Sequence, residues 1–287
     1  MRAAAAFKGR NLDAGGTPPR GMEVGMKSTN EIKSILQAAS IEDLPEFINA
    51  YSSDSRAGVG KLVRTAARRL DEWRREVIRI EKLRVYEEKY RDYTYICGVD
   101  EVGRGPLAGP VVAGAVILPK DCRILYINDS KQLSEKKREE LYDIIMEQAI
   151  SCGVGYAAPG RIDEINILQA TYEAMREAVS SLSPGPDILL NDAVTIPRVE
   201  IPQVPIIKGD AKSISIGAAS IIAKVTRDRL MEEYDKIYPE YGFAGNKGYG
   251  SSGHIEALKK YGPTPIHRRS FIGNFVGEAG TVRPEES

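Results

Sequence analysis

Apolar side chains in the first third of the chain recur with the period of a helix. Leu70, Trp73 and Val77 are spaced by three and four residues, which predicts one amphipathic helix over residues 61–90. A shorter helix is predicted over residues 44–51. The pattern therefore predicts a helical N-terminal extension rather than part of a sheet.

A signal for helix initiation stands at the beginning of this extension. Ser28 and Glu31 have the spacing of a capping box, in which each side chain accepts a hydrogen bond from the backbone of the other residue. Ile32, Ile35 and Leu36 would then share one face of the helix that follows. We expect a short helix that begins directly after Ser28.

The pattern changes at residue 93, where β-branched runs punctuated by Gly and Pro replace the helical spacing. Residues 95–99 and 109–118 predict two strands, and because the loop between them is too short for a crossover helix, they should pair antiparallel. Strands then alternate with helices, which predicts a three-layer α/β domain with a mixed sheet. The other predicted strands cover residues 152–158, 188–192 and 204–208, and the other predicted helices cover residues 134–149, 166–183 and 213–238. In the last helix, small residues predict close packing on the sheet.

Composition divides the chain into four segments. Residues 1–27 are rich in Gly and Pro and have little periodic apolar content, which is typical of a disordered leader. Residues 28–92 are the predicted helical extension and residues 93–275 the α/β domain. We expect a flexible tail over residues 276–287.

Several classes of protein are excluded by composition. A hydrophobic content of 42% with 28% charged residues is typical of a globular protein. The longest nearly apolar run, residues 111–118, has less than half of the roughly 20 residues that a bilayer crossing needs, and the amino end lacks the apolar core of a secretory signal. The three cysteines, Cys97, Cys122 and Cys152, lack the spacing of a zinc knuckle or a redox pair. We expect a reduced, cytoplasmic protein with no membrane contact.

The net charge gives no indication of a partner, because 40 Lys and Arg balance 40 Asp and Glu. The charge is unevenly distributed, however, with twelve Lys or Arg against six Asp or Glu between Arg56 and Arg91. Two interpretations of this basic run stay open: a solvated helix face, and a surface that faces nucleic acid or another partner.

Acidic residues follow several of the predicted strands. Asp100 and Glu101 close the first strand, Asp192 closes a later one, and Asp210 follows the next. Carboxylates gathered at one end of a sheet would repel one another, and a hard cation such as Mg²⁺ or Mn²⁺ would relieve that repulsion. A single aspartate after a strand is more often a turn or cap residue, so spacing alone does not bring the four together.

Alternation along a strand affects the first two acids. Side chains of consecutive strand residues point to opposite faces, so Asp100 and Glu101 should diverge. Glu101 can join the other acids only where the strand ends or twists. Gly103 and Gly105, which follow directly, permit such a departure.

The segment from Cys97 to Pro110, with the sequence CGVDEVGRGPLAGP, closely resembles the opening of the bacterial type 2 ribonucleases H, the ribonuclease HII family. The resemblance covers about residues 93–275 and implies a ribonuclease H-like fold, a mixed sheet flanked by helices. It also implies metal-dependent endonucleolytic cleavage of RNA in RNA–DNA hybrids and at single ribonucleotides in duplex DNA. Four more stretches agree in the expected order, namely NDSK at 128–131, KGD at 208–210, AKVTRD at 223–228 and HRRSF at 267–271.

Roles for individual residues follow from the same resemblance, which makes residues 93–275 the catalytic domain. The loop of Gly103, Arg104 and Gly105 would sense the RNA–DNA junction, and Tyr249 would lie beside the deoxyribose. Independently of the resemblance, candidates for contacts with the nucleic-acid backbone are Lys131, Lys224, Arg268 and Arg269, although a single Lys or Arg is more often only solvated. The matching catalytic carboxylates are Asp100, Glu101, Asp192 and Asp210, of which the first three would hold metal.

The implied mechanism uses two Mg²⁺ or Mn²⁺ ions about 3.5–4 Å apart, which would activate a water and stabilise the leaving 3′ oxygen. Products should then carry 3′-hydroxyl and 5′-phosphate ends. The expected partners are RNA–DNA hybrids and ribonucleotide-containing DNA duplexes, bound by a monomer. Two alternatives are another nuclease or strand-transferring enzyme on the same sheet, and a non-catalytic hybrid-binding module. The four intact acids favour an enzyme over the module.

Overall fold

The computed structural model describes residues 27–276, which form two compact units. The first unit ends at Trp73 and the second begins at Arg74. Apart from their innermost residues, the predicted leader over residues 1–27 and the predicted tail over residues 276–287 lie outside the described residues.

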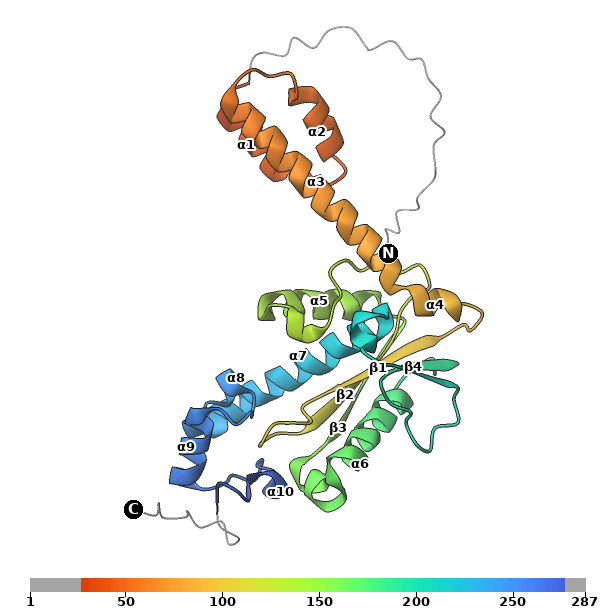
Figure 1. The fold of residues 1–287 in the computed structure, drawn as a ribbon, viewed down its shortest axis with the longest axis vertical. Coiled ribbons are helices and arrows are strands. Elements are labelled where there is room, and N and C mark those ends of the chain that lie inside the picture. The colour runs from red at the N-terminus through yellow and green to blue at the C-terminus, as the bar shows by residue number, and fades with distance from the viewer. Residues whose placement is uncertain (1–26, 277–287) are drawn as a thin grey trace. The chain divides into compact units, whose positions relative to one another are not determined.

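The first unit consists of α1 (Thr29–Ala38), α2 (Leu44–Tyr51) and the first part of α3 (Ala57–Leu83), labelled in Figure 1. The predicted capping box is confirmed: the Ser28 hydroxyl accepts from the Glu31 N–H at 3.3 Å, and the Glu31 carboxylate accepts from the Ser28 N–H at 2.6 Å. These helices bury a small core of their own, which includes Ile32, Leu36, Leu44, Phe47 and Val59.

The prediction of a single helix over residues 61–90 is wrong, because the helix is interrupted between α3 and α4 (Val85–Lys89). The break falls at Arg84, whose φ of −90° and ψ of 5° are not those of a helix. Its buried guanidinium donates to the Lys120 carbonyl at 2.5 Å and also bonds the Glu88 carboxylate. A side chain that contacts another segment therefore interrupts a sequence with an unbroken helical pattern.

The end of α3 belongs to the second unit by its contacts. The Glu76 carboxylate accepts from the Tyr126 N–H at 2.6 Å, and the Arg79 guanidinium donates to the Ile127 carbonyl at 2.6 Å. The sequence divides extension from α/β domain after residue 92, whereas the structure divides the chain after Trp73. At least two arginines of the basic run, Arg79 and Arg84, thus hold backbone carbonyls rather than facing only solvent.

A mixed five-stranded sheet forms the centre of the second unit, in the order β3-β2-β1-β4-β5. As predicted, β1 (Ile96–Val102) and β2 (Val111–Ile117) pair antiparallel, and β3 (Ser151–Ala157) pairs antiparallel with β2. On the other side of β1, β4 (Ile188–Asp192) and β5 (Gln203–Ile206) add in parallel. The mixed α/β sheet expected from the sequence is confirmed.

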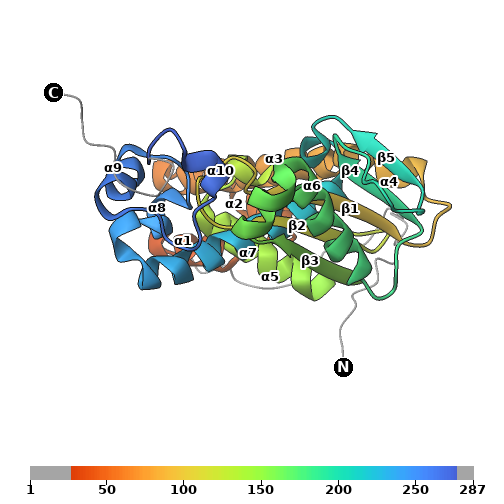
Figure 2. The ribbon, with the colours of Figure 1, turned by 90° about the horizontal axis from the view of Figure 1, so that it is seen from below.

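Helices cover both faces of this sheet. α7 (Ile214–Ile237) and α5 (Glu135–Gln148) pack on one face, and α6 (Pro159–Ser180) packs on the other (Figure 1). Figure 2 shows β4 and β5 together at one edge of the sheet, far from the end of α7 at which α8 and α9 lie. The predicted three layers are therefore present.

The close packing predicted for α7 is confirmed by two glycines of the sheet. A Cβ atom at Gly98 would lie 2.1 Å from the carbonyl carbon of Ser215, and one at Gly114 would lie 2.4 Å from the carbonyl oxygen of Ala219. Side chains at these strand positions would therefore push α7 away from the sheet.

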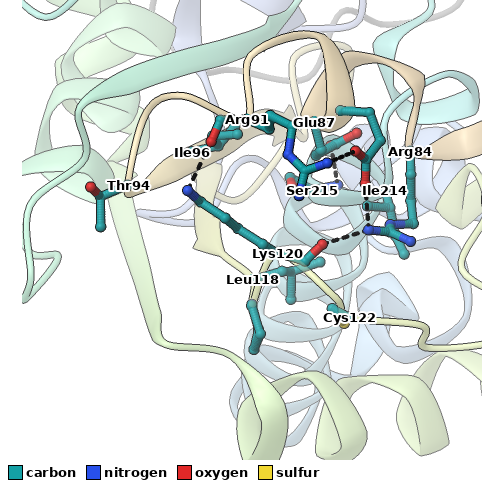
Figure 3. Close-up of a pocket in the computed structure, with 12 residues that line it drawn as sticks. Arg84, Glu87, Arg91, Thr94, Ile96, Leu118, Lys120, Cys122, Ile214 and Ser215 are labelled. Carbon is teal, nitrogen blue, oxygen red and sulfur yellow. Dashed lines mark hydrogen bonds and ion pairs between the residues drawn. The ribbon is translucent and has the colours of Figure 1, made fainter.

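Glu87 of α4 holds the N-terminus of α7. Its carboxylate accepts from the Ser213 hydroxyl at 2.5 Å and from the Ser215 N–H at 3.0 Å. Glu87 and Ser215 line the pocket drawn in Figure 3. Burial raises the pKa of Glu87, and these hydrogen bonds oppose that rise. The helix that the sequence places in the extension is thus joined to the start of the longest helix on the sheet.

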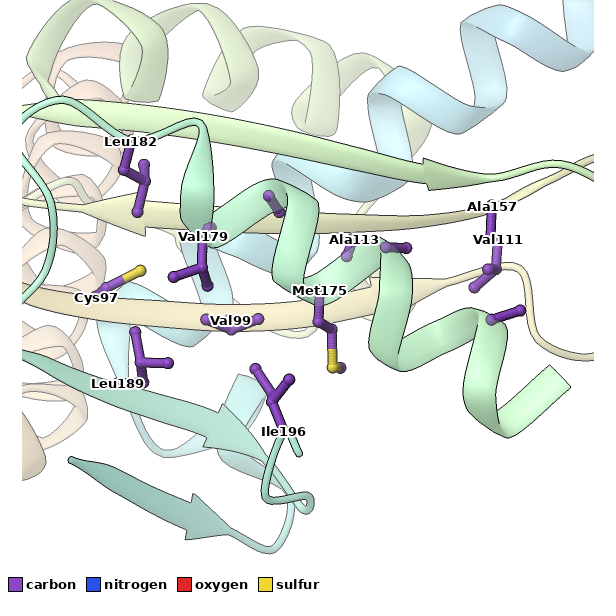
Figure 4. Close-up of a cluster of buried hydrophobic side chains, with 14 of the residues drawn as sticks. Cys97, Val99, Val111, Ala113, Ala157, Met175, Val179, Leu182, Leu189 and Ile196 are labelled. Atoms are coloured by element: carbon purple, nitrogen blue, oxygen red, sulfur yellow. The ribbon is translucent and has the colours of Figure 1, made fainter. Parts of the chain in front are cut away.

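The opposite face of the sheet is closed by α6. Side chains such as Val99 and Ala113 of the sheet meet Met175 and Val179 of α6 (Figure 4). Asn166, with φ 68° and ψ 163°, is not helical, so a kink there divides α6 into two helical segments, and the second begins where the sequence predicts a helix. The Asn166 side chain accepts from backbone N–H groups of the next turn and so restarts the helix.

The chain after α7 folds into short elements that the sequence did not predict. They are η3 (Pro239–Tyr241), α8 (Phe243–Asn246), α9 (Ser252–Tyr261) and α10 (Arg269–Ile272), around a small apolar core. Two further 3₁₀ turns are η1 (Ser130–Gln132), which precedes α5, and η2 (Gly209–Ala211), which lies between β5 and α7. Over residues 27–276, none of the helices has the length and apolar character needed to span a membrane.

Candidate active site

Three of the four predicted acids meet at one end of the sheet. Asp100 lies in β1, Asp192 ends β4 and Asp210 lies in η2 directly after β5, and their carboxylate oxygens are within 4.8 Å of one another. The three strands run parallel, so their carboxyl ends meet at the same edge of the sheet. We call Asp100, Asp192 and Asp210 the acidic group.

Local hydrogen bonds hold these carboxylates in place. The Asp192 carboxylate accepts from the Gly209 N–H at 2.7 Å, which ties the end of β4 to η2. The preceding residue, Asn191, is polar where a buried strand is usually apolar, but its amide donates to the Gln203 side chain at 2.8 Å. Asn191 therefore joins β4 to β5 rather than loosening Asp192.

Burial and like charge disfavour ionisation of the acidic group. Burial raises the pKa of Asp100 well above its usual range, and the carboxylates of Glu101 and Asp192 raise it further. The pKa of Asp210 is raised by burial, by Asp192 and by Asp129. A cation bound among these oxygens would relieve the repulsion, and a donor set of carboxylates alone suits a hard ion such as Mg²⁺ or Mn²⁺.

Glu101 lies outside the acidic group. β1 remains regular through Val102, so Asp100 and Glu101 alternate as strand residues do. Burial raises the pKa of Glu101, and Arg104, whose guanidinium lies 3.4 Å from its carboxylate, lowers it. Its predicted role as a metal ligand stays a prediction.

A cleft of about 410 Å³ borders the acidic group at Asp100. It brings together five of the residues predicted to bind substrate, which come from three distant parts of the chain, whereas Arg268 and Arg269 are not among the residues that line it. Besides Asp100 and Glu101, these lining residues are Gly103, Arg104, Gly105, Lys131 and Tyr249.

The loop from Gly103 to Gly105 rests on a buried arginine of α7. Gly103 has a φ of +89°, and a Cβ there would lie 2.3 Å from the Arg227 Nε, so only glycine fits. Arg227 is itself fully buried and donates to the carbonyls of Ala108, Pro110 and Lys247.

Arg268 has the same supporting role, and its predicted contact with a substrate phosphate is wrong. Its side chain is fully buried and donates to the carbonyls of Gly103, Arg104 and Gly109. The neighbouring Arg269 is exposed and remains available. Sequence alone could not separate the two adjacent arginines, because only the tertiary fold decides which one turns inward.

Tyr249 faces the loop from the far side of the cleft. Its side chain is 47% exposed, and its ring lies 3.8 Å from the position that a Cβ of Gly105 would take. Its carbonyl accepts from the Ser251 N–H at 2.8 Å, so the segment after Tyr249 turns tightly. Ser251 then caps α9, which gives this Gly- and Ser-rich segment a fixed conformation.

Two serines at the cleft were not among the predicted site residues. The Ser220 and Ser130 hydroxyl oxygens lie 3.0 Å apart, and a hydrogen bond from Ser220 lowers the pKa of Asp100 against the effect of burial. Lys224, one turn later in α7, pairs with Asp228 at 2.7 Å. The sequence marked Ser220 only as a small residue, since nothing local indicates that its hydroxyl faces an acid.

Comparison with known proteins places this arrangement in a family. The family model described as "Ribonuclease HII" matches residues 97–274, and the model "Ribonuclease HII N-terminal domain" matches residues 28–91. The ribonuclease HII of Lachnoclostridium phytofermentans is 69% identical over 226 residues, which are 79% of this chain and 89% of that protein. The ribonuclease HII of Clostridioides difficile is 52% identical over 252 residues, which are 87% and 99% of the two chains.

A solved structure agrees with these matches. The crystal structure of the ribonuclease H2 from Pyrococcus horikoshii OT3 superposes with a TM-score of 0.53 at 33% identity, covering 62% of this chain and 93% of that one. The ribonuclease H-like fold that the sequence resemblance implies is thereby confirmed.

Proposed function

Because the chain belongs to the ribonuclease HII family and is a ribonuclease H, we propose that it hydrolyses the RNA strand of RNA–DNA hybrids and nicks DNA duplexes on the 5′ side of embedded ribonucleotides. The observation that carries this proposal is the meeting of Asp100, Asp192 and Asp210 beside a cleft that is lined by the Gly103–Gly105 loop and Tyr249. The acids provide for hydrolysis, and the loop and the tyrosine provide for recognition of the sugars.

The acidic group fits a hard divalent cation such as Mg²⁺ or Mn²⁺, because its donors are carboxylate oxygens and the raised pKa values of Asp100 and Asp210 favour a neutralising cation. We propose that two such ions bind here. Asp100, Asp192 and Asp210 would hold them, with Glu101 as a fourth carboxylate from the same cleft. When bound, such ions supply an activated water and stabilise the leaving 3′ oxygen. Hydrolysis by water leaves 3′-hydroxyl and 5′-phosphate ends.

The remaining cleft residues orient the substrate. Without side chains, Gly103 and Gly105 let the backbone approach a ribose 2′-hydroxyl, the group that distinguishes RNA from DNA. Arg104 and Lys131 carry positive charge toward the phosphates. The half-exposed ring of Tyr249 offers a surface for the next sugar. The 2′-hydroxyl is thus recognised and does not act as the nucleophile.

A nicking assay on three matched duplexes tests the proposal. One contains a single ribonucleotide, one is a long RNA–DNA hybrid, and one is DNA alone. We expect cleavage of the first two in Mg²⁺ or Mn²⁺, with a 5′ nick at the ribonucleotide and ends that a ligase accepts. Equal cleavage of the all-DNA duplex would instead indicate a general nuclease.

We further propose that the enzyme works as a monomer in the cytoplasm, where the nucleic acids of a bacterial cell lie. Light scattering of the purified protein at the concentrations of the assay tests the monomer, and a dimer mass would overturn it.

A further inference from the structure

The two histidines of the sequence meet inside the C-terminal core, beneath Tyr249. The side chains of His254 and His267 are 0% and 2% exposed, and their Nε2 atoms lie 3.0 Å apart. His254 lies in α9, and His267 lies just before α10. Two imidazole nitrogens at this distance form a hydrogen bond only if one of them carries the proton.

The outer partners of the pair determine where the protons are. The Nδ1 atom of His254 lies 2.8 Å from the Tyr249 carbonyl, an acceptor only, so this nitrogen carries a proton. The Nδ1 atom of His267 accepts from the Thr264 N–H at 2.9 Å, so it carries none. In the neutral pair, His267 therefore donates from Nε2 to the bare Nε2 of His254. The result is a directed chain from Thr264 through both rings to Tyr249.

The segment in which this chain of hydrogen bonds begins also supports the Gly103–Gly105 loop on the other side of the cleft. His267 pairs with Ala108 in an isolated bridge, and the next residue, Arg268, holds the carbonyls of Gly103 and Arg104. One short segment thus holds the loop through Arg268 and the tyrosine through the histidine pair.

We propose that His254 and His267 are positioning residues, which set the separation of Tyr249 from the Gly103–Gly105 loop by a hydrogen-bond chain of fixed direction. This proposal rests on the proposed function, because that function assigns Tyr249 a contact with the substrate. Neither histidine touches the substrate, and both act through the Tyr249 backbone.

The surroundings of the pair keep both rings neutral. Tyr241 packs against His267 with ring centres 5.1 Å apart, and Phe243 meets His254 edge-on at 5.3 Å. Burial lowers the pKa of both histidines, that of His267 to about 3, with further lowering of the latter by His254 and Arg269. A second proton on either ring would set two N–H groups face to face and break the chain.

A double-mutant cycle with Tyr249 separates positioning from general stability. We expect His254→Leu, which removes both ring nitrogens, to raise KM for a ribonucleotide-containing duplex by about tenfold, since one aromatic contact with a nucleotide is worth that much. In the Tyr249→Ala background the same change should alter KM less than twofold. An equal factor in both backgrounds would overturn the proposal.

A second variant guards against failure of His254→Leu to fold. In His254→Asn, the side-chain amide can still donate to the Tyr249 carbonyl from the position of Nδ1, so KM should return toward the wild-type value. A KM as high as that of a folded His254→Leu would count against the chain of hydrogen bonds. ¹⁵N NMR of the wild type at pH 7 should also find the proton on Nδ1 of His254 and on Nε2 of His267; the reverse tautomers would refute it.

The cycle is run on whichever duplex the wild type cleaves. Failure to nick at single ribonucleotides overturns the proposed function alone, whereas equal factors in the two backgrounds overturn only the role of the histidines.

Discussion

At one side of the cleft, Asp100 and Asp210 are crowded carboxylates whose pKa values are raised by burial, whereas beneath the other side His254 and His267 are buried rings whose pKa values are lowered by it. Burial disfavours charge in both places. The histidines satisfy each other and their backbone neighbours without charge. The acids place like charges close together, so we expect a cation from solution to bind there.

The same contrast separates residues for chemistry from residues for shape. The carboxylates of the acidic group repel one another, and a bound cation would reduce that repulsion. The histidine pair, with Arg227 and Arg268, uses its polar atoms on backbone carbonyls and holds the substrate side in one conformation. Changes on the first side should therefore affect turnover, and changes on the second should affect stability and substrate affinity.

The largest expected effect is on turnover, from Asp100→Asn. Removal of this central carboxylate should lower the cleavage rate about a thousandfold, or about 4 kcal/mol of transition-state stabilisation, because the remaining acids bind the ions poorly. The fold should persist and even gain stability, since one buried like charge is gone. Single-turnover cleavage and thermal melting measure the two effects.

The matched control is Asp121→Asn, the same chemical change at an exposed position. It should leave both rate and melting temperature unchanged. A rate for Asp100→Asn within about threefold of wild type would show that the acidic group is not the catalytic centre.

Much of the acidic side could be predicted from the sequence, because strand ends are local features. The hydrophobic pattern places Asp192 at the end of a strand, and parallel pairing then brings such ends to one edge. It also ends the first strand at Asp100 and Glu101, whereas β1 continues to Val102, so Asp100 lies within the strand near its end. The pattern also predicted the capping box at Ser28 and the helix over residues 44–51. What it left open was the position of Glu101, which depends on whether β1 twists after Asp100.

The residues that support the substrate side could not be predicted, because tertiary contacts determine their roles. Arg268 and Arg269 are adjacent and chemically alike, and only the fold turns one inward. The histidines are thirteen residues apart and meet only because the segment after α9 folds back against that helix. For the same reason, Arg84 breaks a helix whose local pattern is continuous, since its partner is the distant Lys120.

The next largest effect should come from Arg268→Met, which keeps most of the volume and removes the guanidinium. The carbonyls of Gly103, Arg104 and Gly109 would lose buried donors, and one such unsatisfied group costs about 1–3 kcal/mol. Because the change also removes the cost of burying a charge, we expect a net loss of about 3 kcal/mol in the free energy of unfolding. Urea denaturation measures this loss.

Arg269→Met serves as the control, since it makes the same change one residue later on an exposed side chain. Its free energy of unfolding should stay within about 0.5 kcal/mol of wild type. If both variants lose the same amount, Arg268 does not support the loop in the way that its contacts indicate.

A smaller effect should accompany metal binding to the acidic group. A saturating divalent ion at a hundred times its dissociation constant should add about 2.7 kcal/mol to the free energy of unfolding. Mg²⁺, Mn²⁺ and Ca²⁺ should all stabilise the wild type, but Ca²⁺ should not support cleavage, because its looser coordination places water and phosphate poorly. Melting curves with each ion check this, with Asp100→Asn as the variant expected to respond least. Full cleavage in EDTA would be incompatible with the proposed chemistry.

The smallest effect is on the pH dependence of the free energy of unfolding, which should have opposite signs for the histidine pair and for the acidic group. His267 has a folded-state pKa of about 3, below the unfolded value near 6.5, so the unfolded chain binds more protons as pH falls and stability is lost. Between pH 6.5 and pH 5.5 this loss should be about 1 kcal/mol.

The acids should act in the opposite direction. Asp100 and Asp210 have raised folded-state pKa values, so their contribution is fully present below the unfolded values near 4 and is lost as pH rises through the folded ones. Urea denaturation in EDTA across pH 5 to 7 measures the sum for wild type. His267→Gln removes the titrating ring, so its stability should fall less than that of wild type on acidification, whereas Asp100→Asn removes an opposing acid and should fall more. Parallel pH curves for all three proteins would show that the two sides do not differ electrostatically as their burial implies.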